Sequence, residues 1–268
     1  MNEKTRAGWG LRLWAVFVAV ILVAPLLVVI PVSFSKRASF AFPPHGWSLK
    51  WYASIFEDPR WITAIGSSLL VAVLVTALST VIGTAAALGI HRVGGKAAAA
   101  VTGALMAPMI VPGIVSAVAI YAAYLRWHLT GNLQGFLLAH TVLSMPFVVI
   151  TVLSSLTGVD PTLERAAASL GAGPLRTFLR VTLPGIARGI GAGAVFAFVT
   201  SFDEVVAASF LQSPQIRTLP IEMFVSVTNE VNPTIASVST IILAMTTVVV
   251  LVPMLARSGE QRQKQAKR

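Results

Sequence analysis

The chain has 268 residues, of which 56% are hydrophobic and 11% are charged, with a mean hydropathy of +0.80 and no cysteine. A soluble domain carries about 25% charged residues, so the composition excludes an ordinary soluble protein, and the missing cysteine excludes disulfides and thiolate chemistry. The net charge of +10 suggests nucleic acid or an acidic surface, but in a membrane protein it arises more commonly from Lys and Arg in cytoplasmic loops.

The chain begins with a polar segment, residues 1–12, followed by an apolar span from Leu13 to Val32. The apolar region of a cleaved signal peptide is about 7–15 residues long, so the greater length favours a transmembrane helix. Residues 33–62 are polar and aromatic, and aromatic rings favour the membrane interface. We expect an external loop lying on the bilayer, with aromatic residues Trp47, Trp51, Tyr52 and Trp61.

Five further apolar spans follow, and each exceeds the roughly 20 residues that cross the hydrocarbon core. They are Thr63–Ile90, Ala97–Leu125, Gly135–Thr157, Gly189–Leu211 and Thr234–Ala256. Pro108 and Pro112 predict a kink in the second of these. The sequence thus predicts an all-α integral membrane protein with six transmembrane helices and both termini on one side.

The distribution of Lys and Arg predicts which side that is. With both termini inside, the inner segments hold three, two, four and five of these residues, 14 in all, and the outer ones hold four, one and one, 6 in all. Because cytoplasmic loops carry the excess, we expect both termini and residues 158–188 to be cytoplasmic. Residues 257–268 then form a basic tail, which we expect to be disordered near anionic headgroups.

The segment from Asp160 to Arg188 is predicted to be ordered. Asp160-Pro161 combines a capping side chain with proline at the first helical position, and Gly171 is a typical stop. A second short helix is expected from Gly173-Pro174 to Leu183-Pro184. Two short helices lying end to end on a basic face predict a docking platform. The alternative is a plain cytoplasmic loop made helical by alanine.

Three features of this segment resemble the "EAA" loop of the permease subunits of ABC importers: Ala166-Ala167, Gly171 and, twelve residues on, Leu183-Pro184. The resemblance implies a coupling helix that sits in a cleft of a separate ATP-binding subunit. That family usually has glutamate six residues before the glycine, where this chain has Arg165. The residues expected to couple to the ATPase are Glu164, Arg165, Ala166, Ala167, Gly171, Leu183 and Pro184.

No catalytic, nucleotide-binding or metal site is predicted in this chain. Gly94-Gly95-Lys96 does not form a phosphate loop, because Ile90 stands where a glycine is needed and Ala97 replaces Ser or Thr. Of the scattered histidines, His140 lies early in a span, and a hydrogen-bonded packing role is favoured there over a functional one. None has metal-ligand spacing: His45, His91, His128 and His140. We expect no enzyme activity and no cofactor in this chain.

Small residues recur every four positions in the fifth span. They are Gly185, Gly189, Gly193, Ala197 and Ser201. Small residues at this spacing let helix backbones approach closely in a membrane. The pattern is equally consistent with a pore-lining or subunit-facing helix and with ordinary packing inside this chain.

Asp203 and Glu204 are two adjacent acids in the same span, within SFDEVVAASFL. A carboxylate in a span is costly and usually faces a cavity or partner on a substrate path. Counted from Gly189, Asp203 lies about 21 Å along the helix, in the outer part of the hydrocarbon core. These acids are the candidate substrate-pathway residues. The alternative is that the helix surfaces early and both are wet interface residues.

Three stretches resemble spermidine/putrescine permeases of the second-subunit type: SLKWYASIF, SFDEVVAASFL and LPIEMFVSVTNEVNPTIASVSTIIL. The resemblance implies the type I ABC importer transmembrane fold over residues 13–256 and a small cationic solute such as a polyamine. A cationic solute agrees with the two acids and with Glu222 and Glu230 near the outer mouth. Another charged or amine-bearing solute is the alternative, and an ion-coupled secondary transporter is a more remote one.

The resemblance also implies partners and a location. A second permease, either a paralogue or a copy, would complete the pathway in a bacterial inner membrane. Two ATPase subunits would carry ATP and Mg, and an external solute-binding protein would deliver the solute. No nucleic acid is expected to bind.

Overall fold

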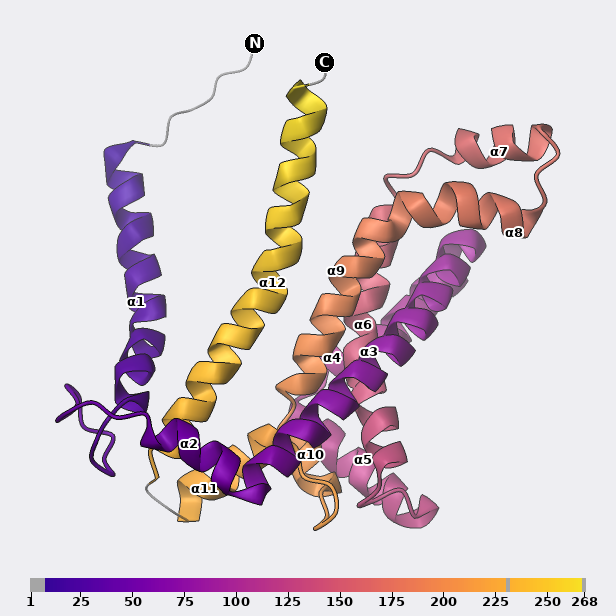
Figure 1. Ribbon diagram of the computed structural model, residues 1–268. Coiled ribbons are helices and arrows are strands. Elements are labelled where there is room, and N and C mark those ends of the chain that lie inside the picture. Colours follow the sequence, from indigo (N-terminus) through magenta and orange to yellow (C-terminus); the bar gives the residue numbers. More distant parts are fainter. Residues whose placement is uncertain (1–7, 230–231, 267–268) are drawn as a thin grey trace. The chain divides into compact units, whose positions relative to one another are not determined.

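The computed structural model describes residues 8–229 and 232–266. Within these residues the regular elements are helices, apart from one antiparallel bridge between Ser35 and Trp47 (Figure 1). The expected all-helical class is therefore confirmed.

Several helices are long and apolar enough to cross a membrane. They are α1 (Trp9–Ser33), α3 (Pro59–Val93), α6 (Leu133–Leu156) and the continuous helix Pro174–Phe202. The pair α4 (Gly95–Ile110) and α5 (Gly113–Trp127) adds one more if it counts as a single span, and Thr234–Val249 is a shorter apolar stretch. Six crossings and cytoplasmic termini stay predictions.

The helix expected from Ala97 to Leu125 is not merely kinked. It is broken into α4 and α5, which meet at an angle of 104°. Val111 is extended, with φ −73° and ψ 132°, and Pro112 precedes the first residue of α5. The residue before a proline is sterically disfavoured in the α conformation, which explains why the helix ends there instead of bending.

The C-terminal tail also differs from the expectation of disorder. Helix α12 runs from Thr234 to Ala266 and so includes most of residues 257–268. Arg, Gln, Lys and Ala dominate this tail, and all four favour helix. The polar composition of the tail predicted disorder. The same residues have a high helix propensity, and the structure shows a helix.

The chain divides into two compact units, one of residues 1–59 and 223–268 and the other of residues 60–222. In the first unit, α1 and α2 (Lys50–Glu57) pack against α12. Hydrogen bonds join the three helices near the end of α1. The Ser237 hydroxyl donates to the Ser33 carbonyl at 3.0 Å, and the hydroxyls of Ser33 and Tyr52 lie 2.7 Å apart.

The aromatic residues of the expected external loop have different environments. The Trp51 indole donates to the Ser35 carbonyl at 2.7 Å, which ties α2 to the end of α1. Trp61 is buried, whereas Trp47 is 68% exposed. Only Trp47 therefore keeps the exposure expected for a ring lying at the membrane interface, since Trp51 and Trp61 serve internal packing.

In the second unit α6 and α9 (Leu183–Phe202) form the most extensive helix pair (Figure 1). Helix α4 packs on α6, and α10 (Val206–Leu211) packs on α5 and α6. This unit also holds nearly all of α3, together with α7 (Pro161–Ser169), α8 (Pro174–Thr177) and the π-helical turn η1 (Phe178–Thr182), and α11 (Leu219–Asn229) starts in this unit and continues into the first. A central cluster of buried side chains is formed by Ala87, Val148, Val149, Val152, Leu156, Ile186 and Ala197.

The small residues of α9 are what allow this close packing. A Cβ added at Gly189 would lie 2.1 Å from the Ser155 hydroxyl and 2.6 Å from the Thr151 carbonyl oxygen. At Gly193 it would lie 2.6 Å from the Thr151 hydroxyl and 2.9 Å from the Val148 Cα. These contacts are all with α6, so the stripe serves packing inside this chain. The sequence was equally consistent with a pore-lining or subunit-facing helix and with packing inside the chain, and the structure favours packing inside the chain.

We expect Gly189→Ala to destabilise the protein by about 1–3 kcal/mol, the usual cost of overpacking. The added methyl group would meet a backbone carbonyl, which can only move if α6 and α9 separate. The measurement is the thermal unfolding midpoint of the purified protein in detergent. Gly66→Ala on α3 is the matched control, because its Cβ would meet nothing within 4 Å. Equal midpoints for the two variants would contradict the packing role.

Candidate functional site

Helix α7 begins and ends where the sequence predicted. The Asp160 carboxylate accepts from the Thr162 backbone N–H at 2.8 Å, and Pro161 is the first helical residue. This hydrogen bond lowers the pKa of Asp160. At the other end Gly171 has φ +80°, and Ala172 N–H donates to the Ala167 carbonyl at 3.0 Å. The positive φ explains the glycine, since other residues adopt it at a cost.

The second half of the segment is not a separate short helix. Pro174 starts a helix that continues through α8, η1 and α9 to Phe202. Leu183-Pro184, expected to end it, lies inside it. The π-helical turn provides the reason, because Leu183 N–H donates to the Phe178 carbonyl five residues back and the turn absorbs the proline.

The two parts of the segment also do not lie end to end. The chain reverses after α7, so that α7 lies beside α8 and η1 (Figure 1). The docking platform, which we define as residues 158–182, is thus a folded-back helix pair. Reversal occurs over Leu170–Gly173, where the left-handed Gly171 turns the backbone.

A hydrogen bond closes this pair. The Thr182 hydroxyl donates to the Glu164 carboxylate, and Thr182 itself is buried. Both residues line a small pocket with His91 and Arg92 of α3. Glu164 is therefore engaged within the chain, whereas its neighbour Arg165 is exposed. We call the Glu164–Thr182 contact the platform clasp.

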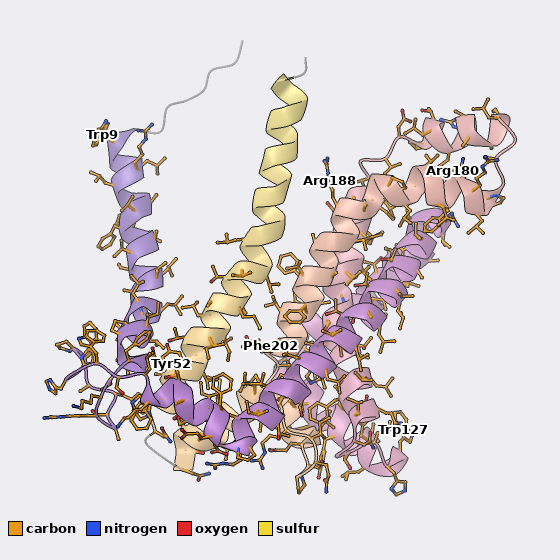
Figure 2. All side chains as sticks on the ribbon, in the orientation of Figure 1. Trp9, Tyr52, Trp127, Arg180, Arg188 and Phe202 are labelled. Carbon is orange, nitrogen blue, oxygen red and sulfur yellow. The ribbon has the colours of Figure 1, made fainter. Side chains whose placement is uncertain are left out.

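The outer surface of the platform is apolar and basic. Arg165, Arg176 and Arg180 are exposed on it, and Arg180 is labelled in Figure 2. Four large apolar side chains are also exposed there, by 53%, 88%, 71% and 50%: Leu163, Leu170, Leu175 and Leu179. Ala166 is exposed and Ala167 is half-buried.

The candidate substrate-pathway acids lie at a helix break, not inside a continuous span. Helix α9 ends at Phe202 and α10 begins at Val206. Asp203 follows α9 and is exposed, while the Glu204 carboxylate accepts from Ala207 N–H of α10 at 2.8 Å. Glu204 thus satisfies one of the first backbone donors of α10. The two acids are adjacent in the sequence but have different environments in the structure.

His140 supports the end of α9 beside this break. Its ring is fully buried, and its Nδ1 lies 3.2 Å from the Ser201 carbonyl oxygen and 3.1 Å from the Ser201 hydroxyl. A carbonyl oxygen only accepts, so Nδ1 carries the proton and donates. The last carbonyls of a helix lack intrahelical donors, and a bond between membrane helices contributes about 0.6 kcal/mol. The packing role favoured from the sequence is the one observed.

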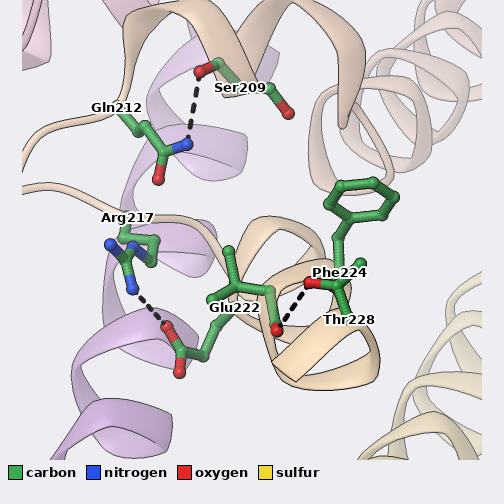
Figure 3. Close-up of polar contacts among 7 residues, drawn as sticks. Ser209, Gln212, Arg217, Glu222, Phe224 and Thr228 are labelled. Atoms are coloured by element: carbon green, nitrogen blue, oxygen red, sulfur yellow. Dashed lines mark hydrogen bonds and ion pairs between the residues drawn. The ribbon is translucent and has the colours of Figure 1, made fainter. Parts of the chain in front are cut away.

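Glu222 is not a solvated residue near the outer mouth. It is 2% exposed, and the Arg217 guanidinium lies 3.0 Å from its carboxylate (Figure 3). The ion pair satisfies the buried charge and holds the start of α11, where the Ser68 hydroxyl also accepts from Leu219 N–H at 2.7 Å. Glu230 lies outside the described residues.

The sequence alone did not reveal the partners of Glu164, His140 and Glu222. Thr182 lies 18 positions from Glu164, and Ser201 lies 61 positions from His140. Each pair joins two different helices, so no local pattern pairs them. For Glu222 a local signal existed, because Arg217 lies five positions earlier just ahead of α11.

Comparison with known proteins places the chain among transport permeases. Residues 79–265 match the family described as the binding-protein-dependent transport system inner membrane component. The putrescine transport system permease protein PotI of Escherichia coli (strain K12) is 30% identical over 250 residues, 90% of this chain and 89% of that protein. The spermidine/putrescine transport system permease protein PotC of the same strain is 30% identical over 234 residues, 87% and 88%.

A solved structure shares the fold. It is a chain of a bacterial ABC transporter involved in the import of the acidic polysaccharide alginate, with a TM-score of 0.70 over 96% of this chain and 98% of that one. Sequence identity is 13%, so this likeness concerns the fold alone.

We expect removal of the platform clasp to loosen α7. Glu164→Ala and Thr182→Val each delete the same hydrogen bond, and a bond to a charged group contributes about 1.5–3 kcal/mol. Partial exposure of Glu164 reduces the contribution of this hydrogen bond. We therefore expect a loss of about 1.4 kcal/mol, which corresponds to roughly tenfold faster deuterium exchange of the backbone amides of α7. Mass spectrometry of the purified protein measures it. Arg165→Ala is the control and should leave exchange unchanged. Unaltered exchange in both clasp variants would show that α7 is held by other contacts.

Proposed function

The chain belongs to the family of binding-protein-dependent transport system inner membrane components, and we propose that it is the pore-forming permease subunit of an ATP-driven importer. Residues 13–256 would form the transmembrane domain in a bacterial inner membrane. The cargo would be a small cationic solute, with polyamines such as putrescine and spermidine as the first candidates. The observation that carries this proposal is the similarity to PotI and PotC along nine tenths of the chain.

The docking platform would receive the ATPase. Its folded-back helix pair exposes apolar and basic side chains, and Gly171 and the platform clasp hold its shape. ATP and Mg would bind to two separate ATPase subunits. ATP-driven closure of these subunits would press on α7, and the continuous helix from Pro174 to Phe202 would carry the movement into the span.

The transport cycle would be alternating access by rocking of packed helices. A second permease would complete the pathway, and an external binding protein would deliver the solute. The close contact of α6 and α9 supports movement of these two helices as one body, since their backbones leave no space for sliding.

Asp203 would be the acid that meets a cation. It is exposed at the end of α9, whereas the Glu204 carboxylate is engaged with Ala207 N–H. An exposed carboxylate attracts a cationic amine without first giving up a hydrogen bond. Glu204 would act by fixing α10, and so would shape the site without touching the solute.

We expect Asp203→Asn to raise the KM for uptake of putrescine about tenfold, because a hydrogen bond to a charged group contributes about 1.5–3 kcal/mol. Glu204→Gln is the matched control. Its amide oxygen can still accept from Ala207 N–H, so uptake should change little. Uptake into proteoliposomes measures both. An Asp203→Asn variant with normal uptake would make the acid structural, and equal losses in both variants would place both acids on the pathway.

The proposal as a whole is tested by ATP hydrolysis of the purified complex with its binding protein. Putrescine or spermidine should stimulate hydrolysis. Stimulation by neither, in a complex that still assembles, would redirect the search to another charged or amine-bearing solute. Failure to assemble with the ATP-binding subunit of the same transporter would contradict the importer assignment itself.

A further inference from the structure

The acids of the docking platform are both engaged within the chain. Residues 158–182 contain two, Asp160 and Glu164. The Asp160 carboxylate accepts from Thr162 N–H, and the Glu164 carboxylate accepts from the Thr182 hydroxyl. Any protein that docks on the platform therefore meets carboxylates whose hydrogen-bonding capacity is already partly used.

Three of the exposed charged residues of the platform are arginines, and its one exposed acid, Asp160, lies at the start of α7, where its carboxylate caps the helix. Arg165 is exposed on α7, Arg176 on α8 and Arg180 on η1. Arg176 and Arg180 border a shallow hollow whose other lining residues are Gly173, Pro174, Leu175 and Leu179. The apolar side chains make the surface suitable for burial, and the arginines set the charge that a partner must match.

Burial of these arginines requires specific chemistry from the partner. Removing a guanidinium from water costs several kcal/mol unless a carboxylate pairs with it in good geometry. Arg presents a rigid fork of donors that matches a carboxylate in two parallel hydrogen bonds. A basic or neutral cleft would leave the charges unpaired.

We propose that the ATP-binding subunit presents carboxylates around an apolar socket to the platform, with one of them paired to Arg165. This inference rests on the proposed function. Arg165 is exposed on α7, so its guanidinium is available to such a carboxylate. The platform clasp supports it, because it removes the nearest acid, Glu164, from competition with the partner.

An anionic lipid surface would also attract the arginines, but the geometry of the platform favours a protein partner over a lipid surface. The clasp and the turn at Gly171 hold α7, α8 and η1 in a fixed arrangement. A fixed arrangement lowers the ordering cost of binding a shaped partner. A fluid layer of lipid headgroups has no fixed shape, so a fixed arrangement of the arginines does not improve its binding.

The test reverses the charge at position 165 by the substitution Arg165→Glu. The permease is purified in detergent free of anionic lipid, and its affinity for the purified ATP-binding subunit of the same transporter is measured at low and high salt. Arg165→Glu should raise the Kd at least tenfold, and the Kd of Arg165→Ala should lie between those of Arg165→Glu and the unaltered chain. High salt should weaken binding of the unaltered chain to the ATP-binding subunit. Lys96→Glu is the control, because it makes the same change in net charge on α4, outside the platform.

The possible outcomes separate this inference from the proposed function. If the unaltered chain does not bind the ATP-binding subunit either with or without added anionic lipid, the importer assignment fails. If it binds and Arg165→Glu binds as tightly or more tightly, only the acidic socket is wrong. A Kd raised equally by Lys96→Glu would show a general charge effect and overturn the pairing at Arg165. Binding of the unaltered chain only when anionic lipid is added would assign the arginines to headgroups and overturn it too.

Discussion

The close contact between α6 and α9 is the constraint on which the rest of residues 60–222 depends. Lipid is as apolar as the side chains of a span, so burial of apolar surface does not hold such helices together. Association must come from short-range contacts and from hydrogen bonds between helices. Gly189 and Gly193 supply the first by bringing the α9 backbone onto Thr151 and Ser155, and the His140–Ser201 pair supplies the second.

The position of α9 then determines the position of the docking platform. One continuous helix runs from Pro174 to Phe202, so α8 and η1 are extensions of the helix that packs on α6. The platform clasp attaches α7 to the same helix through Thr182. In the proposed importer α7 and α9 would move together, because a hydrogen bond and a continuous helix join the docking platform to the span.

Carboxylates in this unit acquire different roles from their surroundings. Glu164 closes the platform, Glu204 satisfies the first turn of α10, and Glu222 is buried against Arg217. Asp203 is the acid left exposed at the break between α9 and α10. The break matters here, because in a continuous helix the two neighbouring acids would have differed only by rotation about the axis.

The amino-acid sequence by itself determined the features that depend on neighbouring residues. Apolar spans, the start of α7 at Asp160-Pro161 and its stop at Gly171 follow from composition and from backbone preferences of single residues. Only the tertiary structure decided what each side chain meets. The small residues of α9 are compatible with any close neighbour, and the fold selects α6. Glu164 and His140 have partners far along the chain, and contacts at such separations depend on how the helices pack together, which no local pattern encodes.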